Sequence, residues 1–300
     1  MKSQSNISVA LCTYNGEKYL REQLESILSQ KIPVNEIVVC DDCSSDETIS
    51  ILNQYREKFP ALFKIYQNEE NLGYVKNFEK AMSICSGEII FLSDQDDIWD
   101  AEKVQKITDF FTQNSQIGVA AHNLNIPAET ETFWDLKKFG KIEKNFSAEK
   151  LLYHILLHGN VFPGMSLAVR REVLNQYLPL KKINSIIIHD YEIVIKSLRD
   201  QNFGIVDEVL GLYRQHHSQS IGYKPKSPIN TDPLTEIQLL SQQFLRLKKY
   251  VAEFNLAENM VSDFQKEINI KYSLFLKQFP LAKRIFIQLK NKYYYKIIHF

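Results

Sequence analysis

The sequence has no excess of either charge. Its 36 Lys and Arg residues balance its 36 Asp and Glu residues, so the formal net charge is zero. Proteins that bind nucleic acid through its phosphates usually carry a basic surface. The zero balance gives no support to a nucleic-acid partner, and we expect none.

The sequence also has few cysteines and no long apolar run. Cys12, Cys40, Cys43 and Cys85 lack the spacing of a secreted disulfide scaffold, so we expect reduced thiols. No stretch approaches the roughly 20 apolar residues that a membrane-spanning helix needs. The first apolar run, residues 7–14, is too short for a signal peptide. These absences predict a cytoplasmic protein.

What is present is an ordinary globular composition. Of the 300 residues, 44 % are hydrophobic and 24 % charged, which suits one large domain or one domain with an appendage. Over residues 7–93, short apolar runs alternate with amphipathic ones, and this order predicts an α/β fold with a parallel sheet covered on both faces. The predicted strands are residues 7–14, 36–42, 63–67 and 88–93, and the predicted helices are residues 17–30, 44–58 and 74–85.

The second half of the chain is less regular. Residues 125–145 predict a loop or an insertion, and residues 203–213 one or two strands. A strand is expected at 166–170 and a helix at 190–199. Three prolines make residues 224–233 a predicted linker, and residues 234–300 are helical in pattern with an expected break at Pro280.

The strongest local signal is the run Ser93-Asp94-Gln95-Asp96-Asp97, which follows a predicted strand. Three carboxylates so close together repel one another, and burying them is costly without a cation. Carboxylate oxygens suit Mg²⁺ or Mn²⁺, which usually bind one or two carboxylates together with substrate phosphates. A solvated acidic turn is the alternative interpretation.

A second polar run, Asp41-Asp42-Cys43-Ser44-Ser45-Asp46, also follows a predicted strand. Ser44 and Glu47 form a capping-box pattern for the next helix. Cys40 and Cys43 have the spacing of a redox motif, but that reading leaves the other acidic cluster unexplained. The carboxyl ends of parallel strands lie on one rim, where ligands of such sheets bind. We therefore expect residues 13–15, 41–44 and 94–97 to lie together.

An ordered set of segments resembles the bacterial family-2 glycosyltransferases, and especially members that assemble O-antigen, capsule or rhamnose-containing polysaccharides. The segments are ALCTYNGEKYLREQLESILSQ, EIVVCDDCSSDET, NEENLGYVKNFEKAMSICSGEIIFLSDQDDIW, PGMSLAVRREVL, HDYEIVI and LYRQHHSQSIG, across residues 7–222. The resemblance implies the GT-A fold, a Rossmann-like and mostly parallel sheet with flanking helices. It also implies a catalytic domain at residues 1–224, and the residue pattern beyond it predicts a helical, basic-aromatic appendage at residues 234–300.

The resemblance implies site roles. Asp190 matches the catalytic base, and Asp41 matches the carboxylate that accepts from a pyrimidine ring, with Asp42 beside it. The implied nucleotide-sugar contacts are Thr13, Tyr14, Asn15, Asp41, Asp42, Asp94 and Gln95. The implied metal ligands are Asp94, Asp96 and His216, and the implied acceptor side is Gly164, Met165 and His189.

Three positions depart from the family pattern. Cys43 stands where the family usually has Gly, so a positive φ there would strain the backbone. His189 stands where Glu is commoner before the base. His217 follows His216 and leaves the histidine assignment open.

These roles imply a metal-dependent, inverting transfer of a sugar from a UDP- or dTDP-linked donor to a hydroxyl of a growing glycan. A divalent ion would neutralise the leaving diphosphate, and a carboxylate would deprotonate the acceptor. A nucleotidyltransferase of similar fold is one alternative, although residues 13–16 lack its Gly- and basic-rich loop. A non-catalytic nucleotide-sugar-binding protein is another, although Asp94, Asp96 and Asp190 are all present.

The tail carries its own charge bias. Residues 271–300 contain no Asp or Glu, and their basic residues alternate with aromatic ones. This mixture suits a peripheral helix on an anionic membrane surface, where a lipid-linked glycan acceptor would lie. It equally suits an amphipathic helix docked on the catalytic domain.

Overall fold

The structure of the chain is a computed structural model that describes residues 5–127, 129–137, 139, 147–181, 186–216, 219, 233–277 and 280. The chain divides into two compact units. The first unit comprises Met1–Leu152 and Asn160–Gly222, and the second comprises Tyr153–Gly159 and Tyr223–Phe300. Residues 153–159, which the sequence analysis placed in the first domain, thus belong to the second unit.

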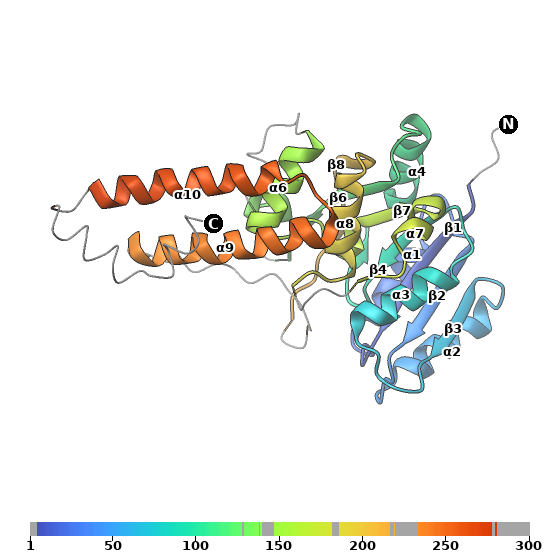
Figure 1. The fold of residues 1–300 in the computed structure, drawn as a ribbon. Coiled ribbons are helices and arrows are strands. Elements are labelled where there is room, and N and C mark those ends of the chain that lie inside the picture. The colour runs from blue at the N-terminus through green and yellow to red at the C-terminus, as the bar shows by residue number, and fades with distance from the viewer. Residues whose placement is uncertain are drawn as a thin grey trace. The chain divides into compact units, whose positions relative to one another are not determined.

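The first unit begins with four parallel strands. They are β1 (Ile7–Thr13), β2 (Glu36–Asp41), β3 (Phe63–Gln67) and β4 (Ile89–Ser93), and they pair in the order β3-β2-β1-β4 (Figure 1). Every residue of β1, β2 and β4 is buried. Continuously buried strands are typical of a parallel sheet with both faces covered, as the alternating pattern predicts.

Three helices connect these strands: α1 (Leu20–Leu28), α2 (Thr48–Lys58) and α3 (Tyr74–Ile84), of which α3 packs on β1 and β2. The capping box predicted at Ser44 is wrong. Helix α2 begins at Thr48 with Glu47 as its N-cap, and the Ser44 hydroxyl donates to Asp41 instead. The Ser44 hydroxyl therefore binds the carboxylate at the end of β2 and does not accept a hydrogen bond from the first turn of α2.

The second half of the unit extends the sheet with mixed directions. Strand β7 (Leu167–Arg170) lies between β4 and β6 (Val119–Asn125), antiparallel to both. Strand β8 (Phe203–Leu212) runs parallel to β6, and the short β5 (Ile98–Trp99) pairs antiparallel with β8. The predicted fold class is confirmed as α/β, and residues 203–212 form one strand.

Helices α4 (Lys103–Gln113) and α8 (His189–Arg199) pack on β8. Residues 125–145 are not simply a loop, because they include α5 (Phe133–Leu136), which a Thr132–Asp135 capping box starts. Two buried aromatic residues, Phe133 and Trp134, hold it against the core. The remaining elements of the middle region are α6 (Ala148–His158), the short 3₁₀ helix η1 (Gly164–Ser166) and α7 (Arg171–Tyr177).

The second unit contains a pair of long helices, α9 (Pro233–Phe254) and α10 (Asn259–Lys277), which pack against each other (Figure 1). Phe244 stacks on Phe264 between them. The chain turns at Asn255, which has a φ of 52° and is a residue that tolerates this conformation. Helix α10 is described to Lys277, and residues 278 and 279, just before the break expected at Pro280, lie outside the described residues, as does most of the predicted linker at 224–233. No described helix is both long and apolar enough to cross a bilayer.

Candidate active site

A cavity of about 490 Å³ opens where β1, β2 and β4 end. It lies wholly within the first unit. The expected convergence of the three strand ends is therefore present. The predicted site residues that line the cavity are Thr13, Tyr14, Asn15, Asp42, Asp94, Gln95, Asp96, Gly164, His189, Asp190 and His216. Asp41 and Met165 lie behind the cavity wall, and His217 falls outside the described residues.

The loop after β1 is tied to both neighbouring strand ends. The Gln95 side chain accepts from Tyr14 N at 2.8 Å and donates to Tyr14 O at 3.0 Å. Asn15 N donates to Ser44 Oγ at 2.9 Å. A Cβ at Gly16 would collide with the Gln95 amide, so a larger residue here would displace that side chain from Tyr14. These hydrogen bonds connect the loop after β1 with the loops after β2 and β4.

The two carboxylates at the end of β2 have different surroundings. Asp41 is fully buried, and its oxygens accept from Thr13 Oγ1, Ser44 Oγ and Ser44 N at 2.5–2.9 Å. Asp42 lines the cavity, and it accepts from Asn68 Nδ2 and from the backbone of Leu72 and Gly73. Asp41 thus organises the loop, whereas Asp42 faces the cavity.

Cys43 adopts a φ of 65°, in the left-handed region that favours glycine. The departure noted in the sequence therefore falls on a backbone position that does need positive φ. Its Sγ contacts Asn68 O at 3.2 Å, and the nearby acidic residues and burial raise the pKa of its thiol. The raised pKa disfavours the redox interpretation, because thiolate chemistry requires a lowered pKa.

The acidic cluster after β4 is largely withdrawn from water. Burial, together with the carboxylates of Asp96 and Asp190, raises the pKa of Asp94 to about 8. Burial and the neighbouring carboxylates also raise the pKa of Asp97, which is 1 % exposed. Asp97 Oδ2 has no hydrogen-bond partner among the described residues. The cluster therefore holds buried negative charge that its protein surroundings only partly balance.

His216 Nε2 lies 2.7 Å from Asp96 Oδ2, and the His216 ring packs against Tyr19. Three neighbouring carboxylates, one of them with a buried oxygen that has no hydrogen-bond partner among the described residues, and an adjacent imidazole form a donor set that fits a divalent cation. Among the described residues, no three acidic, His or Cys side chains are arranged ready for a metal ion. The types of the side chains fit a divalent metal ion, although their arrangement in this structure is not that of a formed metal site.

Asp190 lies across the cavity from the loops, in the first turn of α8. It is 6 % exposed, and burial raises the pKa of its carboxyl to about 7. Hydrogen bonds with the backbone of Tyr191 and Gly164 and with the Asn160 side chain partly offset that rise. Ile188, and not Asp190, is the N-cap of α8. A carboxylate titrating near neutrality is suited to general-base chemistry.

His189 is 4 % exposed, and its ring stacks on Phe78 with 4.0 Å between centroids. Burial lowers the pKa of this histidine to about 3, so the imidazole is neutral at physiological pH and a poor base. Neither ring nitrogen finds a hydrogen-bond partner within the described part of the chain. A Cβ built on Gly164 would lie 3.0 Å from His189 Nε2 and 3.6 Å from Asp94 Oδ2. Gly164 therefore keeps the space between these groups open.

Two further charged residues of the site carry no role in the sequence analysis. Lys103 is fully buried, and its Nζ donates to Met165 O at 2.7 Å. Arg214 donates from Nε to Asp96 O at 2.8 Å, from its backbone to Asp97 Oδ1 at 3.1 Å, and pairs with Glu22. The sequence could have indicated Arg214, which lies within the motif LYRQHHSQSIG. It contains no such indication for Lys103, which lies on the amphipathic helix α4.

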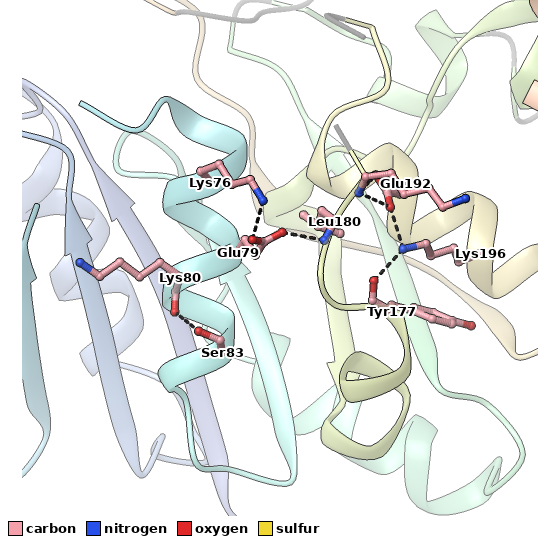
Figure 2. Close-up of polar contacts among 9 residues, drawn as sticks. Lys76, Glu79, Lys80, Ser83, Tyr177, Leu180, Glu192 and Lys196 are labelled. Atoms are coloured by element: carbon pink, nitrogen blue, oxygen red, sulfur yellow. Dashed lines mark hydrogen bonds and ion pairs between the residues drawn. The ribbon is translucent and has the colours of Figure 1, made fainter. Parts of the chain in front are cut away.

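Helix α8 is anchored beyond the site by a buried ion pair. Lys196 Nζ lies 2.6 Å from Glu192 Oε1 and donates to Tyr177 O at 2.6 Å (Figure 2). On the facing helix α3, Glu79 pairs with Lys76 and accepts from Leu180 N (Figure 2). These contacts hold the segment after α7 between α3 and α8.

Comparison with known proteins agrees with the fold. The family model described as glycosyl transferase family 2 matches residues 8–178. The first curated relatives are 25–30 % identical to the chain, which spans only 59–65 % of their length. A dTDP-rhamnosyl transferase of Shigella flexneri is 26 % identical over 222 residues, which is 71 % of this chain and 73 % of that protein.

Two solved structures share the fold. The first is TarS of S. aureus in complex with UDP-GlcNAc, with a TM-score of 0.60 and 19 % identity, covering 93 % of this chain and 77 % of that one. The second is a mannosyltransferase of Pyrobaculum calidifontis in complex with GDP-Man and Mn²⁺. Its TM-score is 0.57 at 14 % identity, over 99 % of this chain and 84 % of that one.

Proposed function

The chain belongs to glycosyl transferase family 2, and from that premise we propose that it transfers a sugar from a UDP- or dTDP-sugar to a hydroxyl of a growing cell-surface glycan. The observation that carries the proposal is that one cavity is lined both by a buried acidic cluster and by a carboxylate with a pKa of about 7. The acidic cluster would hold the metal ion that binds the donor's diphosphate, and the carboxylate with a pKa of about 7 would accept the proton of the acceptor's hydroxyl.

The nucleotide would occupy the loops after β1 and β2. The backbone and side chains of Thr13, Tyr14 and Asn15 line this part of the cavity. Within the described part of the chain, Asp42 Oδ2 accepts a single hydrogen bond, from Gly73 N, so it can accept another from the imide N–H of uracil or thymine. We therefore assign the base contact to Asp42 and a supporting role to Asp41.

We propose that Asp94, Asp96 and His216 hold Mn²⁺ or Mg²⁺, with Asp97 adding negative charge behind them. A bound divalent ion neutralises charge that develops on the leaving diphosphate. Gln95 keeps the loop after β1 beside this cluster through its two hydrogen bonds with Tyr14. The Mn²⁺ in the Pyrobaculum enzyme supports a divalent ion in this fold.

On the acceptor side, Asp190 removes the proton from the attacking hydroxyl as that oxygen bonds to the anomeric carbon. Gly164 leaves room for the acceptor next to this carboxylate, and the backbone of Met165 supports Asp94 from behind. The neutral His189 ring faces the same space and orients the acceptor. One displacement assisted by one base inverts the anomeric configuration.

The test is to incubate the protein with UDP- and dTDP-sugars, Mn²⁺ and a glycan acceptor, and to determine the product's anomeric configuration by NMR. Inversion relative to the donor is expected. Retention would contradict the single displacement, and transfer of a nucleotidyl group instead of a sugar would replace the proposed reaction with a different one.

We also propose that the second unit holds the enzyme at an anionic membrane surface. Its helices expose large apolar side chains, among them Leu245 on α9 and Ile270 on α10, and basic residues without acidic ones follow from residue 271. Sedimentation with liposomes of varied anionic lipid content tests this. Binding should require anionic lipid and weaken in high salt, because about 1 kcal/mol per basic residue is electrostatic. Equal binding to neutral liposomes, or none, would contradict it.

A further inference from the structure

Lys103 is a basic residue in an unusual place, where burial lowers the pKa of its ammonium group well below the usual value and Asp97 and Asp94 partly offset the drop. It is the first residue of α4 and is completely buried. Its ammonium lies 3.7 Å from the centroid of the Trp99 ring and 2.7 Å from Met165 O. Burying an ammonium group is costly unless its surroundings compensate for the lost water. Its surroundings here are one backbone carbonyl, one aromatic face and the negative charge of the neighbouring Asp94 and Asp97.

The carbonyl that Lys103 holds belongs to the segment that joins the two halves of the site. The backbone of Gly164 lies beside both halves: a Cβ built on it would be 3.6 Å from Asp94 Oδ2 and 3.8 Å from Asp190 Cβ. Gly164 and Met165 are neighbours in the short helix η1. A displacement of this dipeptide therefore changes the surroundings of the base and of the acidic cluster together.

We propose that Lys103 is a positioning residue for sugar transfer: by holding Met165 O, it fixes the Gly164–Met165 backbone and with it the spacing between Asp190 and the acidic cluster. The inference rests on the proposed function. Lys103 does not line the cavity, so it acts through the backbone and not on the substrate. An error of about 1 Å in the placement of reacting groups costs on the order of 10²-fold in rate.

A buried lysine also contributes to the stability of the fold. The experiment therefore includes a control lysine that is buried and stabilising but has no role in positioning the site. Lys196 serves as the comparison: it is 7 % exposed, and its Nζ also donates to a backbone carbonyl, that of Tyr177, at 2.6 Å, but unlike Lys103 it also pairs with Glu192 (Figure 2). It does not line the cavity. Lys196→Met and Lys103→Met each keep the aliphatic stem and remove the charge.

The experiment measures melting temperature, donor KM and kcat for both variants, at a temperature where each is fully folded. Both melting temperatures should fall. For Lys103→Met, kcat should fall about 10²-fold while donor KM changes less than about threefold, because the nucleotide loops are untouched. For Lys196→Met, kcat should stay within about twofold of the wild type. Lys103→Arg keeps the charge and the donor, and should recover turnover to within about tenfold.

The inference is overturned if folded Lys103→Met turns over within about threefold of the wild type, or if Lys196→Met loses as much kcat as Lys103→Met. Should Lys103→Met fail to fold, Lys103→Gln, which is neutral and has a shorter reach, is judged by the same limits. A wild-type protein that turns over no nucleotide sugar would contradict the proposed function itself, which separates the two failures.

Discussion

Replacing Asp190 by Asn should inactivate the protein and stabilise it at the same time. The substitution keeps the shape of the side chain and removes its basicity. Turnover should fall by about 10² or more, the usual contribution of a general base, while the affinity for the nucleotide diphosphate stays nearly unchanged. His189 cannot take over, because burial lowers its pKa to about 3.

The stabilisation follows from the direction of the pKa change. Burial raises the pKa of the Asp190 carboxyl from 3.8 to about 7, so between these pH values the folded protein binds a proton that the unfolded chain releases. Its contribution is therefore neutral below pH 3.8 and increasingly destabilising as the pH rises towards 7. At 1.36 kcal/mol per pKa unit, the destabilisation reaches roughly 4 kcal/mol at most. Asn carries no charge and escapes this penalty.

The assay is thermal or urea unfolding of both proteins at pH 5 and pH 8, together with the pH dependence of wild-type kcat/KM. The stability advantage of Asp190→Asn should be larger at pH 8. Wild-type activity should rise with pH and level off above about 7, because only the carboxylate form is a base. A variant that is less stable than the wild type at both pH values, or one that keeps near-normal turnover, would refute the reasoning.

Other consequences concern the remaining parts of the site. Chelation with EDTA should abolish turnover and Mn²⁺ should restore it, whereas full activity in the chelator would rule out the metal role of Asp96. Gly16→Ala should weaken nucleotide diphosphate binding by about tenfold in calorimetry, because the new methyl displaces the Gln95 amide; unchanged affinity would mean that the loop after β1 does not contact the nucleotide. Glu192→Gln should lower the free energy of unfolding by about 3–5 kcal/mol, since it leaves Lys196 buried without its counter-ion, and a smaller loss in urea titration would show that the pair is well hydrated.

The first half of the fold follows from the sequence because each element there carries its own local signal. Continuous apolar runs such as residues 37–40 have no stable place except a strand covered on both faces. The second half could not be predicted in the same way. Strand β7 lies antiparallel between β4 and β6, which are far from it in sequence. Its place in the sheet depends on tertiary packing, which no local pattern of residues reveals.

The site shows the same division between local and tertiary information. The positions of Asp94, Asp96 and Asp190 around one cavity were predictable from strand ends and from the family resemblance. Which of Asp41 and Asp42 faces the ligand was not, because alternate residues of a strand point to opposite sides and the turn after β2 decides the outcome. Lys103 was missed because nothing in a helical pattern of 11 residues reveals which carbonyl a lysine will meet.

The most direct test of the central claim is the release of nucleoside diphosphate from a panel of UDP- and dTDP-sugars in the presence of Mn²⁺. Slow hydrolysis of the donor can proceed without an acceptor, so this measurement needs no knowledge of the glycan. The account predicts release from at least one donor, and its loss in Asp96→Asn while that variant keeps its fold. Release from no donor together with no calorimetric binding of any of them, or undiminished release by Asp96→Asn, would contradict it.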